Sequence, residues 1–410
     1  MADFLKKLTG NRKKKKPRAQ KTGAAQVQSE PIDYQERINR HKRARLLRIL
    51  IALAAVVVIA ALVFLYLERR SYHNYRILET SEQEDVVSTK YLDMDGKIFR
   101  YSQDGVSLVN TDLDTVWSET YSMQNPVADV RGKRAVIADK DGTTMEIFDS
   151  NGLTGTVSTS YTIVKAKIST NGLVAAILDS GDETWINFYG SDGSLIAENQ
   201  TKIDDPGYPM DVAISNDGVI MMVTYQFVDG SETTSYVAFY NFGDVGQNED
   251  DRIVSGYTYE GTVIPEVRYM SGTHSVAVRD DGFTLYEGRQ IPKENKSVNV
   301  EKEIISTFYD EDTIGLVFKN EDKEKLYTME VYSAAGKLEF SRDFNIPYTK
   351  IKISDGYIIM FNSSQIGIMN ENGVTKYSGT VDGTINDIIK IGYNRYLLVL
   401  DTGVNLIKLT

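Results

Sequence analysis

Residues 163–200 read IVKAKISTNGLVAAILDSGDETWINFYGSDGSLIAENQ and contain four short runs separated by turns. The second run, 173–178, is apolar throughout, the third, 184–189, is rich in aromatic residues, and the fourth is polar. The turns at 169–172 and 190–193 contain Asn-Gly and Asp-Gly, which favour tight hairpins because these residues tolerate positive φ. The stretch therefore predicts four antiparallel strands joined by hairpins.

The same plan recurs along the chain at intervals of 36 to 54 residues, which is the range of propeller repeats. The eight segments begin near Tyr91, Val127, Ile163, Pro209, Val263, Ile304, Tyr348 and Ile385. Their second strands are almost continuously apolar, as in residues 219–223 and 396–400, so both faces must be covered. Neighbouring blades of a propeller provide that cover, whereas a two-sheet sandwich would show cleaner alternation.

We therefore predict an all-β fold, a β-propeller of eight four-stranded blades. A propeller of seven blades remains an alternative if residues 208–302 are divided differently. The last segment reaches Thr410 after three strands, so ring closure requires a strand from elsewhere. Residues 72–80 are the natural donor, because pairing the first strand with the last three removes open sheet edges.

A different kind of segment precedes the repeats. Residues 49–67 read ILIALAAVVVIAALVFLYL, carry no charge and, as a helix, span about the 30 Å of a bilayer's hydrocarbon core. A cleaved signal peptide is the main alternative, but 48 residues precede the run and Glu68-Arg69-Arg70 follows it instead of a small-residue cleavage site. We expect a single uncleaved transmembrane signal anchor.

Charge predicts the orientation of this anchor. Residues 1–48 contain 15 basic and 4 acidic residues, a net charge of +11. Removing them from the whole chain's 46 basic and 57 acidic residues leaves 31 and 53, a net charge of −22, in residues 49–410. The positive-inside rule then places 1–48 in the cytoplasm and the acidic domain, 68–410, outside the cell membrane.

The basic tail, 1–48, is expected to be largely disordered, with a juxtamembrane helix over 34–48. Its lysines and arginines are explained by topology and by contact with anionic lipid, in preference to nucleic acid. The residues assigned to lipid contact are Lys13, Lys14, Lys15, Lys16, Lys42, Arg43, Arg45 and Arg48.

Composition excludes several kinds of site. The chain has no cysteine, so disulfides, thiolate nucleophiles and cysteine-based metal sites are absent, which for an exported domain indicates a bacterium. The acidic turns at 93–96 and 139–142 lack the twelve-residue calcium-loop pattern and are interpreted as hairpins. No phosphate loop or Gly-x-Ser-x-Gly elbow occurs, and we assign no catalytic, cofactor-binding or metal-binding residue.

At the level of pattern the repeats resemble WD40-like and quinoprotein-like propellers. With the lysine-rich tail and single anchor, the whole chain resembles an uncharacterised family of membrane-anchored propellers from Gram-positive Firmicutes. The Trp-Asp dipeptide of WD40 blades is missing, and Trp117 and Trp185 do not form the tryptophan pattern of quinoprotein blades. The resemblance therefore implies no quinone cofactor and carries no functional residue across.

Three loops predicted on one face, 204–209, 226–234 and 320–325, exceed the length of a hairpin. Loops on a rigid scaffold often bind partners, so we select Asp204, Asp205, Tyr208 and Asp229 as candidate binding residues. The leading hypothesis is a non-enzymatic binding or scaffold module for a protein or cell-wall polymer. The alternatives are an envelope glycan hydrolase or lyase using carboxylates in the propeller funnel, and a sensor that relays binding to a cytoplasmic partner.

Overall fold

The computed structural model describes residues 34–81, 89–181, 183–201, 206–230, 232–321 and 324–410. The chain divides into two compact units, residues up to Leu67 and residues from Glu68 onward, and each is described by itself. The first contributes the helix α1, Tyr34–Arg69, and the second contributes all of the strands.

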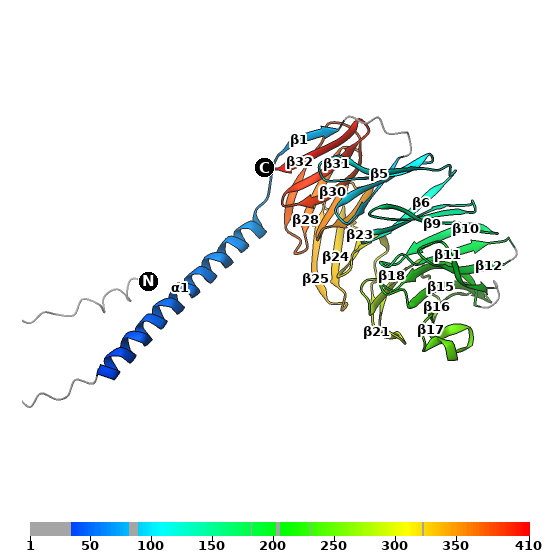
Figure 1. Cartoon of the computed structure of the whole chain (residues 1–410), viewed down its shortest axis with the longest axis horizontal. Helices are drawn as coiled ribbons and strands as arrows, with labels where there is room; N and C mark the ends of the chain where they lie inside the picture. Colours follow the sequence, from blue (N-terminus) through cyan, green and yellow to red (C-terminus); the bar gives the residue numbers. More distant parts are fainter. Residues whose placement is uncertain (1–33, 82–88, 182, 202–205, 231, 322–323) are drawn as a thin grey trace, which may run out of the picture. The chain divides into compact units, whose positions relative to one another are not determined.

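Helix α1 joins the predicted juxtamembrane and apolar segments into one continuous helix (Figure 1). Among the described residues, its part Arg45–Arg69 is the one segment long and apolar enough to cross a membrane. A signal sequence near the N-terminus would have the same character. Lys42, Arg43, Arg45 and Arg48 lie on this helix and are exposed, whereas Lys13 to Lys16 lie outside the described residues.

Eight four-stranded antiparallel sheets follow, so the eight-bladed prediction is confirmed and the seven-bladed reading of 208–302 is wrong. Blade 1 consists of β2 Lys90–Met94, β3 Lys97–Tyr101, β4 Gly105–Val109 and β5 Thr115–Thr120, and blade 2 of β6 Pro126–Arg131, β7 Arg134–Asp139, β8 Thr144–Asp149 and β9 Gly152–Ser158. Blade 3 consists of β10 Thr162–Ile168, β11 Val174–Asp179, β12 Thr184–Tyr189 and β13 Leu195–Thr201, and blade 4 of β14 Tyr208–Ile214, β15 Ile220–Asp229, β16 Glu232–Asn241 and β17 Ile253–Glu260. Blade 5 consists of β18 Glu266–Tyr269, β19 His274–Arg279, β20 Gly282–Glu287 and β21 Lys293–Asn299, and blade 6 of β22 Ile304–Tyr309, β23 Thr313–Lys319, β24 Tyr327–Ser333 and β25 Leu338–Phe344. Blade 7 consists of β26 Lys350–Ser354, β27 Tyr357–Phe361, β28 Gln365–Asn370 and β29 Thr375–Thr380, and blade 8 of β30 Ile385–Gly392, β31 Arg395–Leu400, β32 Gly403–Leu409 and β1 Tyr75–Ser81. Two short 3₁₀ turns, η2 Gly246–Asn248 and η3 Asp250–Arg252, connect β16 to β17.

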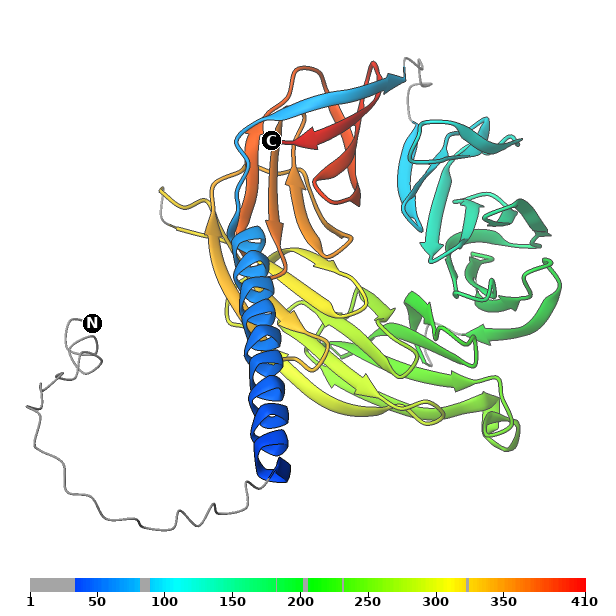
Figure 2. The same ribbon diagram turned by 60° about the vertical axis from the view of Figure 1, so that its left-hand side comes forward.

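The eighth blade closes the ring. Strand β1 pairs with β32 from Tyr75 with Leu409 to Ser81 with Val404, so the first strand of the sequence completes the last sheet. The two strands run side by side, blue against red, in both Figure 1 and Figure 2. Tyr72, just before β1, is buried between blades 7 and 8, so the chain packs against the ring before the strand begins.

The hydrophobic core is divided into eight layers, one between each pair of neighbouring blades. One layer joins blade 8 to blade 1 through residues such as Leu397 and Ile98, so the ring is closed by packing as well as by pairing. The second strand of each blade is buried on both faces, as in β11, while outer strands such as β5 are mostly exposed. This gradient explains the apolar second strands that the sequence shows.

Candidate functional site

Charged side chains line the central channel, because the first strand of each blade faces the axis and carries acidic and basic residues. Lys167 Nζ lies 3.3 Å from Asp129 Oδ1, Lys165 Nζ 3.0 Å from Asp211 Oδ1, and Lys352 Nζ 2.5 Å from Asp387 Oδ1. Each of these pairs joins two neighbouring blades. All three carboxylates also accept hydrogen bonds from backbone: Asp129 Oδ2 from the Ile168 N–H at 3.0 Å, Asp211 Oδ2 from the Val267 N–H at 2.9 Å, and Asp387 Oδ1 from the Ile388 N–H at 2.7 Å.

Other side chains make contacts from blade 2 across the channel to blade 5, and between the neighbouring blades 5 and 6. Arg131 of blade 2 donates from Nη2 to the Tyr269 carbonyl of blade 5. Arg268 lies over the Tyr309 ring, 4.5 Å from its centroid, and the Tyr309 hydroxyl donates to Glu266. The space left among these groups is about 20 Å³, close to the volume that one water molecule needs. On the side of the channel formed by blades 2 to 6, these side chains therefore leave room for little more than a water molecule.

Burial and neighbouring charge shift the pKa values of these groups. Burial lowers the pKa of Arg131 to about 10, with the Arg268 charge acting in the same direction. The Asp129 carboxylate raises the pKa of Lys167, so that lysine stays charged. Burial, and then the Asp211 charge, raises the pKa of Glu266. The channel is thus a network of mutually held charges, and its carboxylates are already engaged by lysine, tyrosine or backbone groups.

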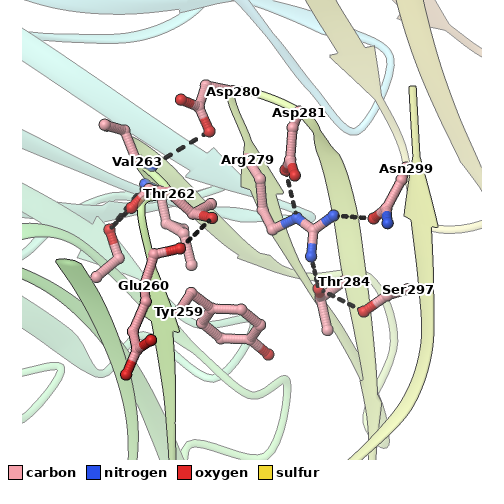
Figure 3. Close-up of polar contacts among 12 residues, drawn as sticks. Tyr259, Glu260, Thr262, Val263, Arg279, Asp280, Asp281, Thr284, Ser297 and Asn299 are labelled. Carbon is pink, nitrogen blue, oxygen red and sulfur yellow. Dashed lines mark hydrogen bonds and ion pairs between the residues drawn. The ribbon is translucent and has the colours of Figure 1, made fainter. Parts of the chain in front are cut away.

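A second polar cluster connects three strands of blade 5 and contacts blade 4 (Figure 3). The Arg279 side chain, 7% exposed, lies with Nε 2.9 Å from Asp281 Oδ1, donates from Nη1 to Thr284 Oγ1 at 3.3 Å, and donates from Nη2 to Asn299 Oδ1. Its guanidinium also lies 5.9 Å from the ring centroid of Tyr259 on β17. All three nitrogens have partners within the chain, so this cluster has a structural role.

The acidic turns are hairpins, as their sequence indicated. Asp93 Oδ1 accepts from the Gly96 N–H at 2.8 Å, and the Gly142 N–H donates to the Asp139 carbonyl oxygen at 2.9 Å in the turn between the paired strands β7 and β8. Within the described residues, no three His, Cys, Asp or Glu side chains are grouped so that they could hold a metal ion.

Of the four candidate binding residues, the structure places only Tyr208. It begins β14 opposite Gln226, and burial, together with nearby Asp179, raises the pKa of its hydroxyl. Asp204 and Asp205 lie outside the described residues, as does the side chain of Asp229. Whether these residues bind a partner therefore stays a prediction.

The same loops border a cavity of about 530 Å³ between the outer parts of blades 3 and 4. We call it the interblade pocket, and it is lined by Asn199, Gln200, Thr201, Pro206, Phe227, Tyr236, Tyr240, Asp251, Ile253 and Thr258. Blade 3 contributes the end of β13, and blade 4 contributes β15, β16 and β17. Blades of a propeller diverge with distance from the axis, and the pocket occupies this wedge.

Side chains of β16 that share one face of the strand form the floor of the interblade pocket. Tyr236, Ala238 and Tyr240 point to one face, and the small Ala238 leaves room between the two rings. On β17, Gly256 makes further space, because a Cβ there would lie 2.0 Å from the Tyr236 hydroxyl oxygen. The Tyr236 ring therefore lies over Gly256.

The deep end of the pocket is buried and polar. Burial raises the pKa of Tyr240 to about 12, and its hydroxyl lies 2.6 Å from that of Tyr225. The sequence reading missed this pocket, although Tyr236-Val-Ala-Phe-Tyr240 shows the aromatic, small, aromatic spacing on one face. What could not be read from sequence was that β13 of another blade forms the opposite wall.

The sequence matches one family along residues 68–409, which covers the whole propeller. The chain belongs to the family of unknown function DUF5711. The family is uncharacterised, as the sequence resemblance suggested, while its membrane anchoring and Firmicutes origin stay predictions. No protein with a curated function matches the sequence of this DUF5711 member.

Solved structures similar to the DUF5711 chain include three propellers. BamB from Moraxella catarrhalis is 12% identical with a TM-score of 0.48, covering 82% of this chain and 98% of that chain. Apo AztD from Citrobacter koseri is 11% identical with a TM-score of 0.49, covering 72% and 87%. The Pan2 WD40 domain from Neurospora crassa is 8% identical with a TM-score of 0.42, covering 69% and 88%. These similarities concern the fold alone.

Proposed function

We propose that this chain is a membrane-tethered, non-enzymatic binding module whose propeller presents the interblade pocket to a protein or cell-wall polymer outside the cytoplasmic membrane. The observation that carries the proposal is the contrast between two regions. Among Asp129, Arg131 and Lys167 the channel side chains leave a cavity of only about 20 Å³, whereas the interblade pocket is a concave site with aromatic and polar walls. Such a mixture is typical of binding sites.

The tether is supported by α1. Its apolar run follows exposed Lys42, Arg43, Arg45 and Arg48, which favour a cytoplasmic N-terminus, and the acidic propeller follows the run. In this proposal the basic residues also contact anionic lipid, and the helix is retained as a signal anchor.

The alternative function, glycan hydrolysis or cleavage by funnel carboxylates, is favoured by one observation. Glu266 has a raised pKa and lies near Asp211, and such a pair can divide acid and base roles. The cavity of about 20 Å³ at this level cannot admit a sugar ring, and both carboxylates have partners. Release of soluble sugars from purified cell walls, abolished by Glu266→Gln, would favour the enzyme over the binding module.

Site-specific photocrosslinking in intact cells tests the proposed function. A photoreactive phenylalanine analogue replaces Phe227, which lines the pocket, or Val228, the next residue on β15, which is 68% exposed. Because alternate strand residues face opposite sides, the two positions report on different surfaces of one strand. The proposal predicts a discrete adduct from Phe227 and none from Val228. Equal labelling from both positions, or none from either, would contradict it.

A further inference from the structure

The interblade pocket has the size of a small-molecule site. Its volume of about 530 Å³ falls within the roughly 300–1,000 Å³ typical of such sites. Its two walls come from different blades, β13 on one side and β15 to β17 on the other. Each blade is held in place by a packed interface, so the pocket is formed before any ligand arrives.

Aromatic side chains supply its apolar surface. Phe227 and Tyr236 are both half-buried, on the paired strands β15 and β16. The Tyr236 ring lies over Gly256, and Ala238 beside it is too small to cover it. A half-exposed aromatic ring offers an apolar surface, and in tyrosine a polar tip as well. A sugar ring has the complementary character, with an apolar C–H face surrounded by hydroxyls.

Groups able both to donate and to accept hydrogen bonds stand next to these rings. Asn199, opposite Ile186 on the face of β13 that is turned toward blade 4, brings a side-chain amide, and Thr258 brings a hydroxyl from β17. An amide offers two N–H donors and a carbonyl acceptor, so it can pair with adjacent sugar hydroxyls in both senses.

The charge of the pocket restricts the ligand further. Among the described residues that line it, Asp251 is the one charged residue, and no described lysine, arginine or histidine does so. Phosphates and carboxylates are recognised by Arg and Lys in proteins, so an anionic polymer lacks such partners among the described lining residues. The net charge of −22 over residues 49–410 adds long-range repulsion against polyanions.

We propose that the interblade pocket binds an uncharged saccharide, with Phe227 and Tyr236 against the sugar ring and Asn199 and Thr258 on its hydroxyls. This assignment rests on the proposed binding function and names the ligand class of the same site. It selects a neutral glycan over an anionic wall polymer and over a protein partner.

Calorimetric titration of the purified full-length chain tests the assignment. The detergent carries no sugar headgroup, because a maltoside or glucoside would compete for the site. The probes are three neutral disaccharides, cellobiose, maltose and di-N-acetylchitobiose, and digalacturonate as the anionic counterpart. The assignment predicts that at least one neutral disaccharide binds and that digalacturonate binds at least about tenfold more weakly.

Variants locate the binding. Tyr236→Ala and Asn199→Ala are each expected to weaken binding of the neutral disaccharide about tenfold or more, equivalent to about 1.4 kcal/mol. Tyr236→Phe keeps the ring in place and is expected to bind within about threefold of the natural chain, which guards against misfolding of Tyr236→Ala. Tyr393→Ala removes a tyrosine that is 60% exposed on blade 8 and should change nothing.

Two results would overturn the saccharide assignment: digalacturonate binding as tightly as the neutral sugars, or no neutral disaccharide binding at all at about 10 mM. Photocrosslinking separates this failure from failure of the proposed function. A protein adduct from the Phe227 position without disaccharide binding would support the proposed binding function and refute the saccharide assignment. Absence of both adduct and sugar binding would remove both.

Discussion

Replacing Asp211 is expected to destabilise the propeller more than replacing any surface acid. Asp211 is 1% exposed and joins three blades, because it pairs with Lys165 of blade 3 and accepts from the Val267 N–H of blade 5. Asp211→Ala removes both contacts and leaves a buried N–H without a partner, which costs about 1–3 kcal/mol.

The ion pair adds to this loss. Breaking a buried pair costs about 3–5 kcal/mol when the remaining charge is fully buried. The Lys165 side chain is 35% exposed, so water compensates part of the loss. We therefore expect Asp211→Ala to lower the free energy of unfolding by about 3 kcal/mol. Asp211→Asn keeps an acceptor for Val267 and should lose only about 1–2 kcal/mol.

Urea titration of the full-length chain, followed by the fluorescence of Trp117 and Trp185, measures these differences. The control is Glu339→Ala, which breaks an exposed pair with Lys337 and should change stability by less than about 0.5 kcal/mol. A loss for Asp211→Ala no larger than that for Glu339→Ala would refute the reasoning that the channel network holds the blades together. So would an equal loss for Ala and Asn at position 211.

Three further predictions concern the ring. Because burial raises the pKa of Glu266 above its usual 4.5, the folded state binds this proton more tightly than the unfolded state, so the stability it contributes is lost as pH rises through the raised pKa. The urea midpoint of Glu266→Gln should then lie above that of the natural chain near pH 7 and equal it near pH 4. The same difference between the two midpoints at both pH values would contradict a raised pKa of Glu266. Arg279→Lys, which replaces three nitrogens by one, should lower the free energy of unfolding by about 2–4 kcal/mol, and a urea midpoint unchanged from the natural chain would show that the cluster is not stabilising. Deletion of β1, Tyr75–Ser81, exposes the edge of β32 and should convert a well-dispersed protein into aggregates on size-exclusion chromatography; an unaltered elution profile would mean that β1 does not close the ring.

The repeat spacing was enough to predict the blades, because in most blades at least one hairpin carries an Asn-Gly or Asp-Gly turn that marks its position in the local sequence. The predicted starts near Tyr91, Ile163 and Ile385 fall within one residue of β2, β10 and β30. The strand predicted over 72–80 corresponds to β1, Tyr75–Ser81.

The pocket and the channel network could not be predicted in the same way, since both depend on which residues of different blades meet. Arg131 reaches a carbonyl 138 residues away, and nothing in the local sequence around it specifies that partner. Likewise Asn199 and Tyr236 lie in adjacent blades, and their shared cavity depends on how far those blades diverge. The loops chosen for their length contribute Pro206 and Phe227 to the pocket wall, whereas Asp204, Asp205 and the side chain of Asp229 lie outside the described residues.

Placement of the propeller outside the cytoplasmic membrane is the central claim, and cysteine labelling tests it most directly because the chain has no cysteine of its own. Single cysteines replace Lys21 in the tail and Tyr393 on blade 8, and a membrane-impermeant maleimide is added to intact cells. The account predicts labelling of Tyr393→Cys in intact cells, labelling of Lys21→Cys only after permeabilisation, and full-length mass for both. Labelling in the reverse order, or loss of the N-terminal segment from the labelled propeller, would contradict it.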